Sequence, residues 1–320
     1  MAKSDPSIAR RNLTRARTFI EAGRLDAAEK ALTRALEFTE SERLYADIHT
    51  LHAQIATTRG NAQEALESWY QVAAALRAIL DCSDPDCRCG DDTAEVLSEF
   101  VVCRLAIASI HAARIECFRA ATIVDEAIGR LWPHEDDERF RRLLEECLII
   151  RTSELLHCHR LHEALGLANE LRVRALEMPL ALRARAFEVI GRAEKDHQEC
   201  ADAADAFEAA AEAYAALVKE ESDVRERLLI VALEHGVERA HTGDHARAAE
   251  VLDDALRAAS GFEGEDPNWS EYLLQAQIAF GDALEQLERC EEAAEAYRGA
   301  VANLKARSEA EPSRLARILG

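Results

Sequence analysis

Small and large apolar side chains in the middle of the chain recur at helical intervals. Phe187, Ile190 and Gly191 share one face of a helix, because spacings of three and four residues return to the same side. A polar break at residues 196–199 follows, and a second helix then repeats the spacing with Ala203, Phe207 and Ala210. The pattern predicts two antiparallel helices that pack closely, with Gly191 and Ala203 allowing the backbones to approach.

The same hairpin recurs along the chain when each unit is aligned on the alanine equivalent to Ala203. This alignment gives seven units, with their alanines at Ala28, Ala65, Ala120, Ala164, Ala203, Ala248 and Ala293. The predicted units span approximately residues 9–40, 41–80, 93–133, 138–178, 180–217, 223–260 and 268–303, and a short capping helix is expected at 308–320. Gly23, Gly60 and Gly243 are expected to form turns between helices. The third unit has no glycine at its expected turn, 116–118.

This order of large, small and turn residues resembles the tetratricopeptide repeat, a helical hairpin that stacks into arrays. The resemblance implies an all-α fold, an α-solenoid of about seven antiparallel helix hairpins forming a right-handed superhelix. Residues 1–320 are expected to form one such solenoid, since a repeat array grows in one dimension and needs no domain boundary.

Charge and hydropathy limit the partners. With 39 Lys and Arg against 60 Asp and Glu, the net charge is −21, which disfavours nucleic acids and anionic membranes as main partners because phosphate binding needs clustered basic residues. No apolar run approaches the ~20 residues that a membrane span needs. The N-terminal residues lack the apolar core of a signal peptide. A cytoplasmic location with reduced thiols is therefore expected.

Three thiols lie close together in one acidic loop at Cys82, Cys87 and Cys89. They are candidate zinc ligands, with a fourth ligand such as Cys103 or His111 required from elsewhere. The alternative is an exposed acidic loop with incidental or redox-active cysteines. The stretch 157–162, His-Cys-His-Arg-Leu-His, is a second candidate metal site, and a solvated turn is the alternative there. No cofactor other than zinc is suggested.

The sequence contains no phosphate loop, HExxH motif, nucleophile elbow or paired-carboxylate motif. We therefore predict that the protein is not an enzyme.

The resemblance also implies a binding groove, because the first helices of such hairpins line a concave surface that takes peptides or partner helices. Carried over by position, the expected groove residues are Arg10, Leu13, Arg17, Thr50, Gln54, Ile149, Ser153, Arg185, Glu188, Arg192, Leu233 and Ile278. The Lys and Asn set that clamps chaperone tails in some family members is absent. The four arginines are positioned to capture an acidic partner segment, and the alternative is that they balance neighbouring Glu residues.

The leading functional hypothesis is a protein interaction scaffold or adaptor that binds a partner segment in this groove. The alternatives are a regulatory sensor switched by a peptide or metal ligand, and a self-assembling structural protein that forms homo-oligomers. This inference is by analogy with the fold, which hosts many functions.

Overall fold

The computed structural model describes residues 6–82, 93–218, 224–260, 262 and 268–310, with side chains to residue 305. Within these ranges the chain forms α-helices and one short 3-10 helix, and no strand. The all-α prediction is confirmed.

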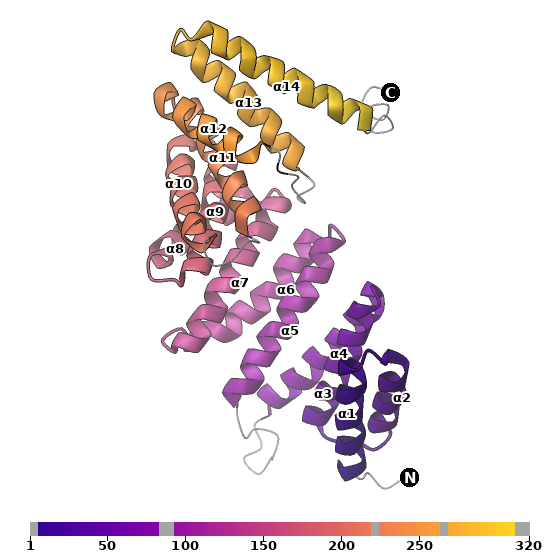
Figure 1. Cartoon of the computed structure of the whole chain (residues 1–320). Coiled ribbons are helices and arrows are strands. Elements are labelled where there is room, and N and C mark those ends of the chain that lie inside the picture. Colours follow the sequence, from indigo (N-terminus) through magenta and orange to yellow (C-terminus); the bar gives the residue numbers. More distant parts are fainter. Residues whose placement is uncertain (1–5, 83–92, 219–223, 261, 263–267, 311–320) are drawn as a thin grey trace. The chain divides into compact units, whose positions relative to one another are not determined.

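The helices belong to two compact units, Met1–Cys158 and His159–Gly320. Figure 1 labels the helices of both units. The first unit contains α1 (Pro6–Glu21), α2 (Leu25–Leu36), α3 (Glu42–Thr58), α4 (Ala62–Leu80), α5 (Thr93–Ala113), α6 (Cys117–Leu131), the 3-10 helix η1 (Trp132–His134) and α7 (Glu138–His157). The second unit contains α8 (Leu161–Ala175), α9 (Leu180–Asp196), α10 (Cys200–Leu217), α11 (Arg225–His241), α12 (His245–Ala259), α13 (Trp269–Gln286) and α14 (Cys290–Ala310).

Every turn that leads into one of the seven aligned alanine helices contains a residue in the left-handed backbone conformation. Glycine supplies it where the sequence predicted, with φ values of 69° at Gly23, 71° at Gly60 and 83° at Gly243. Four turns use other residues, namely Ile115, His159, Gln198 and Glu288. The third turn therefore lies at Ile115, just before the position expected from the sequence.

The alignment on seven alanines is confirmed. Each of these alanines is the fourth residue of its helix and follows the left-handed turn residue by five positions. Each amide donates the first helical hydrogen bond to the carbonyl of the N-cap residue, as Ala203 does to Glu199 at 2.9 Å. All seven side chains are buried, so only a small residue fits this position.

Close packing within a hairpin depends on a small residue of the first helix facing a large residue of the second. A Cβ atom added to Gly191 would lie 2.8 Å from ring atoms of Phe207. At Gly236 it would lie 2.4 Å from Cγ of Leu252, and at Gly281 it would lie 2.5 Å from the ring of Tyr297. The aromatic-against-glycine arrangement read from residues 187–210 is thus present in two hairpins, and in a third the large residue is a leucine.

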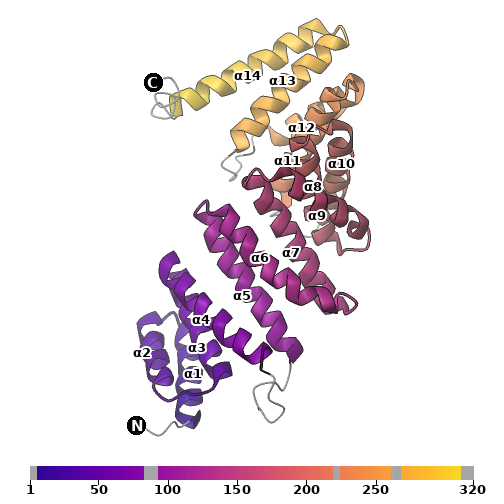
Figure 2. The same ribbon diagram turned by 180° about the vertical axis from the view of Figure 1, so that it is seen from behind.

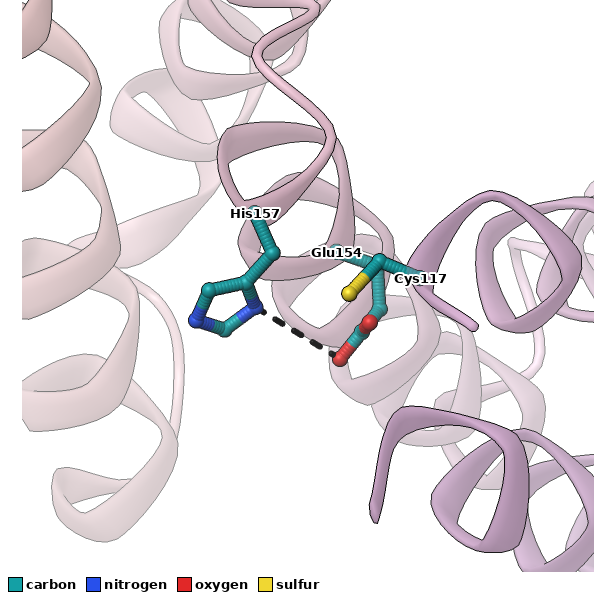
Figure 3. A group of neighbouring side chains, drawn as sticks. All are labelled: Cys117, Glu154 and His157. Atoms are coloured by element: carbon teal, nitrogen blue, oxygen red, sulfur yellow. Dashed lines mark ion pairs between the residues drawn. The ribbon is translucent and has the colours of Figure 1, made fainter. Parts of the chain in front are cut away.

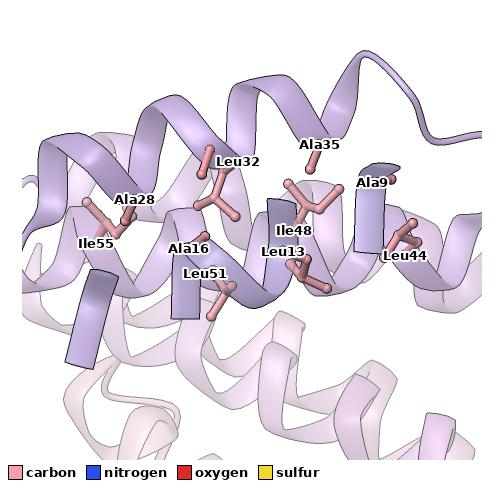
Figure 4. Packing of buried hydrophobic residues seen from close by; sticks show 11 residues of the cluster. Ala9, Leu13, Ala16, Ala28, Leu32, Ala35, Leu44, Ile48, Leu51 and Ile55 are labelled. Atoms are coloured by element: carbon pink, nitrogen blue, oxygen red, sulfur yellow. The ribbon is translucent and has the colours of Figure 1, made fainter. Parts of the chain in front are cut away.

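The first hairpin and the helix that follows it share one hydrophobic core (Figure 4). Leu13 of α1, Leu32 of α2 and Ile48 of α3 are buried together in it. Small residues such as Ala16 and Ala28 are fully buried between them, so the helices pack with few large side chains. Burial of this apolar surface, worth about 25 cal/mol per Å², supplies most of the stability of such a unit.

Helix α5, by length and composition alone, could cross a membrane, with a mean hydropathy of 1.6 over 18 residues. This differs from the expectation that no run is long and apolar enough. Half of that window is buried within the protein, and α5 lies beside α4 and α6 in both views (Figure 1 and Figure 2). Its buried Arg104 pairs with Glu126 of α6 at 2.8 Å. These contacts are typical of a core helix, and the lack of a membrane partner stays a prediction.

Helix α14 runs without a break from Cys290 to Ala310. It therefore continues past residue 303, where the last unit was expected to end. The expected capping helix at 308–320 lies mostly outside the described residues.

The glycine contacts predict opposite effects for two Gly-to-Ala substitutions in the second unit. Gly236→Ala is expected to lower the free energy of unfolding by roughly 1–2 kcal/mol, because overpacking against Leu252 outweighs the gain in helix propensity. Gly166→Ala, on α8 with no atom within 4 Å of the added Cβ, is the matched control and is expected to raise it by up to about 1 kcal/mol. Urea unfolding followed by circular dichroism measures both. Equal effects of the two substitutions would contradict the packing argument.

Candidate functional site

The first unit contains a cavity of about 510 Å³ across the first helices of its hairpins. We call it the first-helix cavity. It runs obliquely, from the last part of α1 across the middle of α3 to the first half of α5, with α4 beneath. Its lining residues are Arg17, Ala46, Asp47, Thr50, Leu51, Gln54, Trp69, Val72, Leu76, Ser98, Glu99 and Val102.

The floor of this cavity is apolar. Leu51, Val72 and Leu76 are nearly fully buried and form part of the lining. Val102 of α5 projects from the rim and is 54% exposed. An exposed valine beside a concave apolar floor is suited to contact an apolar side chain of a partner.

Charged residues surround the apolar floor. Arg43 of α3 donates two hydrogen bonds to Glu99 of α5, at 2.5 and 2.6 Å, and so ties two successive first helices together. Asp47 lies farther from Arg43, at 3.9 Å. Burial raises the pKa of Asp47, and the charges of Arg43 and Arg17 oppose this shift only in part. Asp47 is therefore a partly desolvated carboxylate in the lining of the cavity.

Three of the predicted groove residues, Arg17, Thr50 and Gln54, line the first-helix cavity. Four others are buried at 5% exposure or less and contribute to packing: Leu13, Ile149, Glu188 and Leu233. The remaining residues lie outside the cavity, at exposed or half-buried positions: Arg10, Ser153, Arg185, Arg192 and Ile278.

Arg192, one of the four arginines expected to bind an acidic partner, forms an ion pair within the protein. Its guanidinium lies 2.9 Å from the carboxylate of Glu188. Glu188 also accepts hydrogen bonds from Arg227 of α11 at 2.9 Å and from the hydroxyl of Tyr214 at 2.7 Å. Arg192 thus neutralises a buried glutamate, which is the alternative that the sequence left open.

A second cavity of about 430 Å³ lies among α10, α11 and α12 of the second unit. Sequence reasoning missed it because only the first-helix face was considered. Its lining includes the buried His235, whose Nε2 accepts a hydrogen bond from Arg239 at 3.1 Å. Arg239 in turn donates to Asp205 and Glu208. Because Nε2 accepts, the ring is neutral, and burial lowers the pKa of His235 to about 4.

The two metal sites suggested by the sequence have different outcomes in the part of the chain that the structure describes. Cys82 is exposed, and Cys87 and Cys89 lie outside the described ranges. In the stretch 157–162, His162 Nδ1 lies 3.3 Å from Nε2 of His197 on α9. The zinc prediction for the Cys82 loop stays a prediction.

Comparison with known proteins identifies the fold. No family model matches the chain, and no curated protein matches its sequence. Among solved structures, a signal transduction ATPase with numerous domains and a tetratricopeptide repeat sensor, from Pyrococcus horikoshii, gives a TM-score of 0.63 at 12% identity. The match covers 95% of this chain and 43% of the length of that protein. The fold is of the tetratricopeptide-repeat type.

Two further structures share this fold. The apo form of the quorum sensor NprR from B. thuringiensis has a TM-score of 0.51 at 12% identity, covering 92% of this chain and 87% of its own. Aspartyl phosphate phosphatase F from Bacillus subtilis has a TM-score of 0.53 at 10% identity, covering 95% of each chain. Because one of these proteins carries an enzyme's name, the lack of enzymatic activity here stays a prediction.

The environment of His235 predicts an acid-sensitive contribution to stability. The pKa falls from 6.5 in the unfolded chain to about 4 in the folded one. The contribution of neutral His235 to the free energy of unfolding is therefore complete above pH 6.5, and it is lost as the pH falls towards 4. His235→Gln is expected to reduce the loss of unfolding free energy between pH 7 and pH 5 by on the order of 1 kcal/mol. Urea titrations at both pH values measure this, and an unchanged difference in the variant would contradict it.

Proposed function

We propose that this protein is a binding scaffold that holds a segment of a protein or peptide partner in the first-helix cavity. The observation that carries the proposal is an apolar-floored cavity opening across three successive first helices, rimmed by charged residues from α1, α3 and α5. Concave apolar sites with a few polar groups are the usual binding sites of proteins. The fold supports the same class of function, since the similar structures include two proteins described as sensors.

The lining indicates the chemistry of the segment. An apolar side chain would contact Leu76 and Val102, and a neighbouring Lys or Arg would pair with Asp47, whose own cation is 3.9 Å away. An ion pair of this kind gains most where the carboxylate is already partly desolvated. A segment with an apolar residue beside a basic one therefore fits better than the acidic segment considered from the sequence.

A peptide sensor is the second candidate, and it uses the same cavity. Because the cavity contacts α1, α3 and α5 together, a bound peptide would favour one arrangement of these helices over others. Such a shift requires only that the peptide bind the two arrangements with different affinity. Self-assembly remains a prediction without a specific contact to support it.

Blocking the cavity from its rim tests the proposal. Val102→Arg places a long side chain at a position that is already 54% exposed, so the fold is expected to survive. Val173→Arg, on α8 at 81% exposure, is the matched control outside the cavity. In pull-downs from a lysate of the source organism, quantified by mass spectrometry, the Val102→Arg variant is expected to lose at least ~90% of a partner that wild type and control retain. This corresponds to about tenfold weaker binding, or 1.4 kcal/mol.

A partner captured equally by all three proteins would show that this cavity is not the binding site. Asp47→Asn separates the two kinds of segment. This substitution is expected to weaken the binding of a basic segment and to leave the binding of an acidic segment unchanged or stronger.

A further inference from the structure

Two groups of side chains in the two units repeat the same three residue types. In the first unit, Cys117 of α6 lies beside Glu154 and His157 of α7 (Figure 3). The thiol sulfur, a carboxylate oxygen and an imidazole nitrogen lie within 4.8 Å of one another. The ion pair in this group joins His157 Nδ1 and Glu154 Oε1 at 3.9 Å.

The second group occupies the equivalent position two hairpins later. Cys200 of α10 lies beside Glu238 and His241 of α11, again within 4.8 Å of one another. His241 Nδ1 is 3.4 Å from Glu238 Oε2.

The two groups also share their positions within the helices. In each group the cysteine is the first residue of the second helix of one hairpin, and the histidine is the last residue of the first helix of the next. In each group the glutamate precedes the histidine by three residues, on the same helical face.

The two glutamates are buried without a sufficient counter-charge. Glu154 is 7% exposed and Glu238 is 1% exposed. One carboxylate oxygen of each, Glu154 Oε2 and Glu238 Oε1, is buried and accepts no hydrogen bond from a described residue. A buried carboxylate that lacks a cation costs several kcal/mol. Each group therefore lacks a positive charge at its centre.

Three other buried glutamates on first helices have a Lys or Arg partner. Glu188 pairs with Arg227 at 2.9 Å, and Glu234 pairs with Lys195 at 2.5 Å. Glu194 pairs with Arg172. Among the described residues, Glu154 and Glu238 each form an ion pair with a histidine whose side chain is more than half exposed. These three glutamates thus have a Lys or Arg beside them, whereas Glu154 and Glu238 have a histidine.

We propose that each group binds one Zn²⁺ ion through the cysteine sulfur, the glutamate oxygen and the histidine nitrogen. Sulfur, nitrogen and oxygen ligands together suit zinc, whereas Ca²⁺ and Mg²⁺ prefer oxygen alone. Three protein ligands leave a fourth position for water or for a donor from a partner. The exposed histidine can rotate at little cost to bring its nitrogen to the roughly 2.0–2.1 Å that zinc requires.

Zinc binding changes the chemistry of each group in a defined way. The thiol loses its proton to solvent and the sulfur binds the ion as thiolate. The ion supplies the positive charge that the buried carboxylate lacks. Because the ligands come from two successive hairpins, each ion links one hairpin to the next, and zinc is expected to raise the stability of both units.

Zinc binding to the tag-free full chain, stripped of metal and measured against a chromogenic zinc indicator, tests the proposal. His157→Ala and His241→Ala are each expected to lower the number of bound ions by about one, and the double variant by about two. Both histidines are largely exposed, so these variants are expected to fold. Cys290→Ala is the matched control, because Cys290 is also the first residue of its helix but belongs to neither group. It is expected to bind as many ions as wild type.

Two further readouts separate ligation from an effect on folding. With Co²⁺ in place of zinc, a thiolate-to-metal charge-transfer band is expected and should disappear in the Cys117→Ala, Cys200→Ala double variant. In zinc-free buffer, Glu154→Gln and Glu238→Gln are expected to raise the melting temperature, because each removes an uncompensated buried charge. In the variant with both Glu154→Gln and Glu238→Gln, adding zinc is expected to raise the melting temperature no further.

Three results would overturn the proposal. One is a wild-type chain that binds no zinc. Another is a double histidine variant that binds as much zinc as wild type. The third is loss of all bound zinc on Cys82→Ala, which would place the metal in the loop after α4.

Discussion

The close approach of two helices in each hairpin is the constraint on which the rest of this structure depends. It requires a small residue on the first helix wherever a large residue of the second points at its backbone, as Gly191 does for Phe207 and Gly236 for Leu252. The buried alanine at the fourth position of each second helix provides the same clearance near the turn. Once these contacts are fixed, the faces that remain for neighbouring hairpins and for ligands are fixed as well.

This constraint explains which features were predictable. Small and large residues at intervals of three and four are visible in the sequence, so the hairpins and the seven aligned alanines could be derived from it. The groove was harder to derive. Periodicity shows which residues of a helix share a face, but it does not show how successive first helices are offset. The cavity therefore includes Arg17 and Thr50 as expected, and it also reaches Ser98 and Val102 of α5, which were not among the expected groove residues.

Partners from different hairpins were beyond sequence reasoning for a similar reason. The pairing of Glu188 with Arg227, or of Cys117 with Glu154, joins residues about forty positions apart. Acidic residues are so frequent in this chain, 60 of 320 with Asp included, that no pattern marks the buried ones. Only the structure shows which of these acidic residues are buried. For Glu188 of α9 and Glu234 of α11, the paired cation comes from the neighbouring first helix. Such pairs fix how successive hairpins are oriented more than they add to stability.

The turn residues carry a consequence for how the chain acquires its structure. A left-handed conformation is readily adopted by glycine but costs other residues roughly 1–2 kcal/mol. The turns at Gly23, Gly60 and Gly243 can therefore form early and locally, whereas those at Ile115, Gln198 and Glu288 form only when the helices on either side hold them. Ile115, β-branched and almost fully exposed, gains nothing from its own contacts. We expect the glycine hairpins to act as nuclei from which folding spreads, and the others to be the first to open when the chain is heated or pulled.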